Sequence, residues 1–560
     1  MSYSIQIIGG SIIDEVSYKV ATITIIGSFI VLVSTAMSTW YGKPVVFHES
    51  PTLHSLLIQI VKTLNSIKLE ILYMVSFLIG FMTRLYPELK YAGLPLSCDT
   101  LEYISVARDF LQEPKILTTY LWIGWWRNLP PLLTWISGFS AWVGIDPWVF
   151  FKIYPPIMVG AMSTIIAAIV YRISDSKLAA LISSLVMSFN PYILGQSLQW
   201  HRHVLGVLML LIYIYLCERR SRTLHRALVL AITALSYEPT AVIALLLSIA
   251  ETVTSRDWRS RSIFALSTSI ALLVLLWYIG SPWRPIVTIT PVGVYVAGNI
   301  EYNPEPALKY TIVCILLLTP SLTVIPLWRR IDWRAKLTIT VLFTAFILPT
   351  LSVIAPVDQH RWFLMLLTLL TPYTIVGLMK FSKSLLILIT LITVILGSAY
   401  PFTEYGYKHF IIWPDVSIEP AAGYPWRMTP ALTNITDLEN VANIIKSSRD
   451  LILVSSVLYP QLHLYIRNPI NIRVIGQDPT LPVVISYAIS RDISRLLVIT
   501  VVNITKQLEE FRENPSFYNM IMSIYLGKEK FVSIEEIKCE EIYSGSRLSA
   551  YIVEIVRNHK

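Results

Sequence analysis

The sequence predicts a polytopic α-helical membrane protein, with about 11–13 membrane helices, followed by a small α/β domain outside the membrane. Of the 560 residues, 54% are hydrophobic and only 14% are charged, whereas a soluble globular chain carries roughly 25% charged residues. Several apolar runs reach the roughly 17–25 residues that a membrane-spanning helix requires. After Tyr400 the composition becomes that of a soluble domain.

The charge and the cysteine content further restrict the class of protein. The net charge of +9 comes from basic residues in short loops between apolar runs, which indicates membrane orientation rather than nucleic-acid binding. The four cysteines show no metal-type spacing and exclude a disulfide framework. Two alternatives remain for Cys98 and Cys539: a single disulfide bridge between them, or free thiols. No cleavable signal sequence is evident.

The chain divides into three predicted parts. Residues 1–67 form an N-terminal segment with one extra span, at about Val20–Met37. Residues 68–400 form a transmembrane domain, in which 85–148 is the first outer loop. Residues 401–560 form an extracytoplasmic α/β domain. We expect spans of the transmembrane domain at Leu69–Met82 with its flanks, Val149–Tyr171, Leu178–Leu194, Val204–Cys217, Ile263–Gly280, Thr311–Trp328, Leu337–Ile354, Trp362–Met379 and Leu385–Ser398.

The first outer loop is rich in aromatic residues and proline between positions 117 and 149. Tryptophan and tyrosine favour the membrane interface, so we expect helices lying on or partly in the outer leaflet. The alternative is an ordinary span at Leu132–Val143, which is a short run for that purpose.

Basic clusters determine the expected orientation. Five clusters lie in short loops, and all five reach the cytoplasm only if one apolar stretch, Ala227–Ala250, does not cross the membrane. Tyr237-Glu238-Pro239 interrupts that stretch, and proline disfavours helix at the preceding residue. We therefore predict two half-helices that meet at Glu238–Pro239 and return to the same side. This topology places Asp99 and the C-terminal domain outside.

The C-terminal part alternates between strand-like and helix-like segments, which is typical of a layered α/β domain. Asn434 and Asn503 each begin a glycan-acceptor tripeptide, which weakly supports an outside location. The expected elements are helices at Asp437–Lys446 and Lys506–Arg512, and strands at Asp450–Ser456, Ile472–Ile475, Arg495–Val502, Glu540–Tyr543 and Ala550–Ile555.

One stretch in the first outer loop carries a specific pattern. A membrane helix ending near Arg84 is followed by Pro-Leu-Ser-x-Asp-x-x-x-Tyr-x-x-x-Ala-Arg. The pattern resembles the first outer loop of GT-C glycosyltransferases, which include dolichyl-phosphate-mannose protein mannosyltransferases and lipid A aminoarabinose transferases. In organisation the resemblance covers roughly residues 68–400. The matching residues are Pro95, Leu96, Ser97, Asp99, Tyr103, Ala107 and Arg108.

The resemblance implies inverting transfer of a sugar from a polyprenyl-phosphate donor, of the dolichyl-phosphate type, to an acceptor at the outer membrane face. The frequent Asp-Glu pair of the family is Asp99-Thr100 here, and Glu102 or Asp109 are the candidates to compensate. No Trp-Trp-Asp-Tyr-Gly motif is present, which argues against transfer of an N-linked oligosaccharide to sequons.

Asp99 is the candidate catalytic base, because a carboxylate that takes the proton of the acceptor lowers the barrier to attack. The competing interpretation is that Asp99 only caps the helix that begins at Leu101, since Asp is a good N-cap. Glu102 is the second catalytic candidate, three residues along the same helix; otherwise it is a solvated loop charge.

Donor phosphate requires positive charge near the outer face. Arg361, in the motif Asp358-Gln-His360-Arg361-Trp, opens a span at that depth and offers a bidentate fork; the alternative is an interfacial arginine that reaches toward the headgroups. Arg84 is a second candidate. The third is the trio His201-Arg202-His203, which suits phosphate better than metal. The candidate substrate-binding residues are thus Arg84, Tyr103, His201, Arg202, Glu238, Asp358, His360 and Arg361.

Glu238 is an expected intramembrane carboxylate, which is a functional hypothesis by default, although its position also reflects the turn at Pro239. The expected partners are a polyprenyl-phosphate-linked sugar, membrane lipid, and an acceptor protein, lipid or glycan. No cofactor is certain, and the need for a divalent metal stays open. The alternatives are a lipid-linked oligosaccharide transferase and, from another class, a membrane transporter, which usually shows internal repeats that are not evident here.

Overall fold

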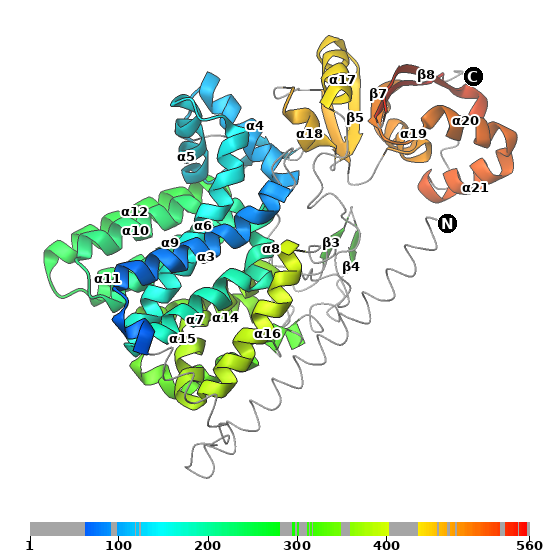
Figure 1. Ribbon diagram of the computed structural model, residues 1–560. Coiled ribbons are helices and arrows are strands. Elements are labelled where there is room, and N and C mark those ends of the chain that lie inside the picture. The colour runs from blue at the N-terminus through cyan, green and yellow to red at the C-terminus, as the bar shows by residue number, and fades with distance from the viewer. Residues whose placement is uncertain are drawn as a thin grey trace.

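The structure is a computed structural model, and the residues that it describes are 62–90, 98–117, 119–122, 125–280, 294–296, 299–301, 311–312, 314–315, 317–348, 359–402, 435–455, 458–466, 471–475, 479–526, 533–546 and 548–556. The extra span expected at Val20–Met37 and the acceptor tripeptide at Asn434 begin outside these residues. Figure 1 shows a large helical bundle with a smaller domain of strands and helices at one of its ends.

Five helices in the described part of the chain are long and apolar enough to cross a membrane. Together with the composition, they confirm the predicted multi-pass membrane protein. They are α3 (Leu69–Lys90), α6 (Pro147–Ser174), α9 (His201–Glu218), α12 (Trp258–Ile279) and α15 (Gln359–Phe381).

Shorter helices complete the bundle. The span expected at Leu178–Leu194 is two helices that meet at Asn190–Pro191, because proline restricts the residue before it. The remaining helices are α4 (Cys98–Gln112), α5 (Pro131–Trp142), α7 (Lys177–Phe189), α8 (Pro191–Gln199), α10 (Thr223–Ser236), α11 (Glu238–Thr254), α14 (Trp333–Ile347) and α16 (Lys383–Phe402).

The predicted helix break beside Glu238–Pro239 is confirmed, while the return of both helices to the same side of the membrane stays a prediction. Helix α10 ends and α11 begins at Tyr237, whose backbone is extended (φ −162°, ψ 143°). The two helices pack against each other, and Pro239 lies in the first turn of α11, where its missing N–H costs no hydrogen bond.

Two regions differ from expectation. The aromatic loop begins with a hairpin of β1 (Thr119–Trp122) and β2 (Trp125–Asn128) rather than a helix. Helix α5 follows it; its 12 residues reach roughly 18 Å, too short for a span. The expected span Thr311–Trp328 is instead largely a 3-10 helix, η1 (Thr319–Arg330), which contains Pro320 and Pro326. A second hairpin pairs β3 (Val294–Val296) with β4 (Asn299–Glu301).

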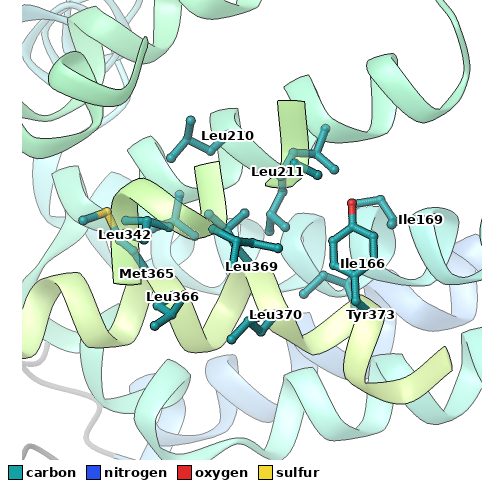
Figure 2. Packing of buried hydrophobic residues seen from close by; sticks show 14 of the residues in the cluster. Ile166, Ile169, Leu210, Leu211, Leu342, Met365, Leu366, Leu369, Leu370 and Tyr373 are labelled. Atoms are coloured by element: carbon teal, nitrogen blue, oxygen red, sulfur yellow. The ribbon is translucent and has the colours of Figure 1, made fainter. Parts of the chain in front are cut away.

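Helix α15 lies at the centre of the bundle core. Figure 2 shows its side chains Met365, Leu366, Leu369 and Leu370 packed among residues of neighbouring helices. Burial of these apolar side chains against one another excludes lipid and water from the centre and holds the surrounding helix ends in fixed relative positions.

Three of the predicted cytoplasmic segments meet around one buried carboxylate. Glu251, 1% exposed, accepts from Arg226 at 2.7 Å and from Arg334 at 2.5 Å. The hydroxyl of Tyr213 also donates to it, at 3.0 Å. These contacts bring together α9, α10, α11 and α14 at the end of the bundle where the basic clusters lie.

The C-terminal domain is a five-stranded mixed sheet between two helical layers. Strand order is β6-β5-β7-β9-β8, in which β6, β5 and β7 are parallel and β9 and β8 pair antiparallel. The strands are β5 (Leu451–Ser455), β6 (Ile472–Ile475), β7 (Arg495–Thr500), β8 (Ile537–Ser544) and β9 (Ser549–Ile555). The predicted strands are therefore confirmed, with shifts of a few residues at their ends.

Alternate residues of each strand contact opposite helical layers, as the two-residue period of a strand requires. One layer is α17 (Ile435–Ser447) and α18 (Tyr459–His463); the other is α19 (Leu481–Ser490), α20 (Ile504–Glu513) and α21 (Pro515–Leu526). Helices α18, α19 and α21 were not expected. A single 3-10 turn, η4 (Ile534–Glu536), precedes β8.

Candidate functional site

Helix α4 carries the predicted base. The backbone of Asp99 lies in its first turn, while the side chain of Asp99 lies outside the described set. The next residue, Thr100, is buried, and its Oγ1 lies 2.9 Å from Nε2 of His201 at the start of α9. One turn later, the hydroxyl of Tyr103 accepts a hydrogen bond from Nε of Arg202 at 3.1 Å. The start of α4 is therefore joined to the start of α9.

Glu238 binds two arginines. Its Oε1 lies 2.5 Å from Nη2 of Arg127 and 3.6 Å from Nη1 of Arg202. Its other oxygen, Oε2, is buried without a hydrogen-bond partner among the described residues. The break between α10 and α11 places this carboxylate beside both arginines, because Glu238 is the first residue of α11.

Arg361 lies close to the same break. Its Nη1 donates to the hydroxyl of Tyr237 at 2.8 Å, and its guanidinium lies over the ring of Trp200 at 5.3 Å. Such stacking is a cation–π interaction, which suits Arg better than Lys. Arg361 thus reaches the residue next to Glu238 from a different helix, α15.

His201 is surrounded by aromatic rings. The rings of Tyr103 and Phe151 lie 5.2 and 5.7 Å from it, and the residue is 1% exposed. His203 contacts different rings, those of Trp200 and Tyr237. Across the described part of the chain, no group of three or more His, Cys, Asp and Glu side chains is placed to hold a metal ion.

Arg84 is fully buried at the end of α3. It pairs with Glu88 at 2.8 Å and donates through Nε to Ser197 at 3.0 Å. Ser197 lies in α8, four residues before His201, so Arg84 borders the site through Ser197.

Glu102 pairs with a residue of the C-terminal domain. Its Oε2 lies 2.6 Å from Nδ1 of His463 in the C-terminal domain, and both side chains are essentially inaccessible to solvent. Of the other predicted residues, Asp358 lies outside the described residues, and the side chain of His360 lies outside them too.

Taken together, the ends of α4, α9, α11 and α15 and the β1–β2 hairpin converge on one region that contains three guanidinium groups. The residues of this arginine cluster are Arg127, Arg202 and Arg361, with Glu238 as the carboxylate among them. A carboxylate that accepts from two arginines aligns their side chains, and planar guanidinium forks suit an anion such as a phosphate.

Three members of the site were not singled out from sequence. Arg127 lies in the aromatic part of the first outer loop and carried no prediction of its own, and Tyr237 was predicted only as part of a helix break. His463 lies in a segment with no functional signal. Of these three, Arg127 could have been predicted, because it is the single basic residue between positions 117 and 149 of the predicted outer loop.

Comparison with known proteins finds likenesses among solved structures alone. No family model matches the sequence, and no curated protein matches it significantly. Among solved structures, the chain is similar to ArnT from Cupriavidus metallidurans, both bound to undecaprenyl phosphate and in the apo state. Each likeness covers 86% of this chain and 97% of that chain, at 11% sequence identity and a TM-score of 0.47.

Proposed function

We propose that this protein is a glycosyltransferase of the GT-C type, which transfers a sugar from a polyprenyl-phosphate donor to an acceptor at the outer face of the membrane. The observation that carries this proposal is the arginine cluster, one helical turn from Asp99. Arg202 contacts Tyr103, and Tyr103 lies four residues, about one turn, after Asp99 on α4.

In the proposed reaction, an oxygen or nitrogen of the acceptor attacks the anomeric carbon of the donor sugar and forms a new glycosidic bond. The bond from that carbon to the phosphate oxygen breaks, and the phosphate leaves with the electron pair. Asp99 takes the proton of the acceptor. The displacement inverts the configuration at the anomeric carbon.

The arginine cluster supplies what the leaving group needs. Negative charge develops on the phosphate as the bond breaks, and guanidinium groups that are already oriented stabilise that charge without reorganisation. Glu238 orients Arg127 and Arg202 for this purpose, while Tyr237 and Trp200 orient Arg361.

The test is the variant Asp99→Asn, measured in membranes with a radiolabelled polyprenyl-phosphate sugar. Asn is close to Asp in size but accepts no proton at neutral pH, and the helix begins at Cys98 rather than at Leu101, so Asp99 is not its N-cap. We expect transfer to fall by about 10²–10⁴-fold, with unchanged expression and thermal stability. Transfer at the wild-type rate would remove Asp99 from the catalytic role.

A matched control replaces a carboxylate that lies away from the site. Asp257 caps the start of α12 by accepting a hydrogen bond from the amide of Ser260 at 2.7 Å, whereas the other end of that helix lies near the hairpin, where the Trp277 carbonyl accepts from Asn128. Asp257→Asn should therefore leave transfer within about two-fold of wild type. If wild-type protein transfers no sugar from any polyprenyl-phosphate donor, the proposed function itself is wrong.

A further inference from the structure

Helix α4 is contacted from a second side by the C-terminal domain. Helix α18 packs against α4, and Figure 1 shows the domain at the end of the bundle where α4 lies. The link between them is the pair of Glu102 and His463, which are 361 positions apart in the sequence. The side chain of His463 is 1% exposed and that of Glu102 is 0% exposed, so each has exchanged contact with water for contact with the other.

Neighbouring contacts reinforce this link. Arg108, on the same helix, donates to the carbonyl of Leu464 at 3.3 Å. The side chain of Leu464 packs in the same apolar cluster as Ile104 and Ala107 of α4. The C-terminal domain therefore contributes both polar and apolar contacts to the helix that carries Asp99.

Tyr459 completes the contact. Its ring lies 5.1 Å from that of His463, and it is 1% exposed. Burial is the main factor that raises its pKa above the ordinary value, and the carboxylates of Glu102 and Asp109 add to that shift. The phenol consequently stays neutral and fills the space beside His463, which holds the imidazole against Glu102.

We propose that His463 is a positioning residue for transfer: by binding Glu102, it joins the C-terminal domain to α4 and sets the position of Asp99. This inference rests on the proposed function of Asp99. Glu102 lies three residues, less than one turn, from Asp99, so a shift of Glu102 moves the base. In this assignment Glu102 positions Asp99 and is not a second base.

The physical reason is that both partners are buried. Removing His463 takes a hydrogen-bonding partner at 2.6 Å from a carboxylate that is inaccessible to solvent, and breaking a buried pair by removing one member is strongly unfavourable. The favourable response is for α4 to move Glu102 toward water. Misplacement of a reacting group by about 1 Å costs roughly 10²-fold in rate.

The experiment uses the full chain in lipid nanodiscs. The variant His463→Leu removes the hydrogen bond, whereas His463→Asn keeps a nitrogen donor close to the position of Nδ1. The control Arg495→Gln removes an ion pair of the same domain with Asp450 and Glu554, which is half-exposed. Measurements are amide hydrogen exchange of α4, binding of undecaprenyl phosphate, and kcat and KM for transfer.

For His463→Leu, we expect exchange of the α4 amides to increase about 10-fold or more, because local opening becomes easier. We also expect kcat to fall by roughly 10–100-fold, with KM for the donor and the affinity for undecaprenyl phosphate within about two-fold, because the arginine cluster is on other elements. His463→Asn should recover most of both losses, and Arg495→Gln should resemble wild type.

Unchanged exchange of α4 in His463→Leu would overturn the proposal, whatever the activity. An increase of exchange throughout the bundle, without recovery in His463→Asn, would also overturn it, since that pattern indicates general destabilisation. If α4 responds as expected but the wild type transfers no sugar, the proposed function fails while the link between α18 and α4 stands.

Discussion

At the scale of single residues, the arginines of the cluster have two kinds of partner: Arg127 and Arg202 share the carboxylate of Glu238, whereas Arg361 contacts neutral aromatic side chains. Arg127 is aligned by the carboxylate of Glu238, at 2.5 Å. Arg361 donates to the neutral phenol of Tyr237 and lies over the Trp200 ring. An anion that replaces the phenol as acceptor gains a charge-assisted hydrogen bond, which is roughly twice as strong as a neutral one.

We therefore expect Arg361→Gln to weaken binding of undecaprenyl phosphate by roughly 10–100-fold, the equivalent of one lost charged hydrogen bond. The affinity of Arg361→Lys for undecaprenyl phosphate should lie between those of the wild type and Arg361→Gln, because an ammonium keeps the charge but not the planar fork. Titration of the lipid against protein in nanodiscs measures the difference. As a control, Arg172→Gln alters the opposite end of the bundle, where Arg172 donates to the Glu218 carbonyl. Equal affinity for Arg361→Gln and wild type would place the phosphate elsewhere.

At the scale of elements, helices α3 and α6 cross at small residues. A Cβ added at Gly80 would lie 2.5 Å from Oγ of Ser163 and 2.8 Å from the carbonyl of Val159. On the other helix, a Cβ at Gly160 would meet the Phe77 carbonyl at 2.9 Å. Small residues at such crossings let membrane helices approach closely. Arg84, one turn after Gly80 on α3, lies beside Ser197 of α8.

Gly80→Ala should therefore lower the free energy of unfolding by about 1–3 kcal/mol, because the added methyl forces α3 away from the backbone of α6. Thermal unfolding in detergent, followed by intrinsic fluorescence, measures the change. Gly280→Ala is the matched control: among the residues that the structure describes, an added Cβ there meets carbonyls of the preceding helix turn, the nearer at 3.3 Å. A Gly80→Ala protein as stable as wild type would show that α3 and α6 do not approach so closely.

At the scale of the whole molecule, two polar regions lie at opposite ends of the bundle. Helix α9 begins at His201, beside the arginine cluster, and its 18 residues end at Glu218, roughly 26 Å away. The Glu251 network and the basic loops lie at that second end. The orientation predicted from the basic clusters, in which the arginine cluster lies outside, stays a prediction.

Cysteine labelling of intact cells tests that orientation. A membrane-impermeant maleimide should label Glu113→Cys, an exposed position after α4, and should not label Arg259→Cys, an exposed position at the start of α12. Native Cys539 is a free thiol, but burial raises its pKa to about 11. It is therefore protonated and slow to react at neutral pH. The reverse labelling pattern would show that the predicted membrane orientation is wrong.

Local patterns sufficed for much of the fold. The long apolar runs that become α6, α9, α12 and α15 were predicted, as were the break at Tyr237 and the strands of the C-terminal sheet. Each depends on hydropathy, proline or alternation within a short window. The span expected at Thr311–Trp328 was wrong because apolar composition does not distinguish an α-helix from the 3-10 helix that Pro320 and Pro326 accompany.

The features of the site also divide into those that the sequence predicts and those that depend on tertiary structure. The sequence alone determined a membrane protein with Asp99 at the start of a helix and with Arg202, Glu238 and Arg361 at helix ends, because each follows from neighbours along the chain. Only the tertiary structure decided that Arg127 pairs with Glu238, 111 positions away, and that Glu102 binds His463 rather than water. Those partners depend on which helix ends and which domain surface converge, and that convergence is set by packing of the whole bundle rather than by local sequence.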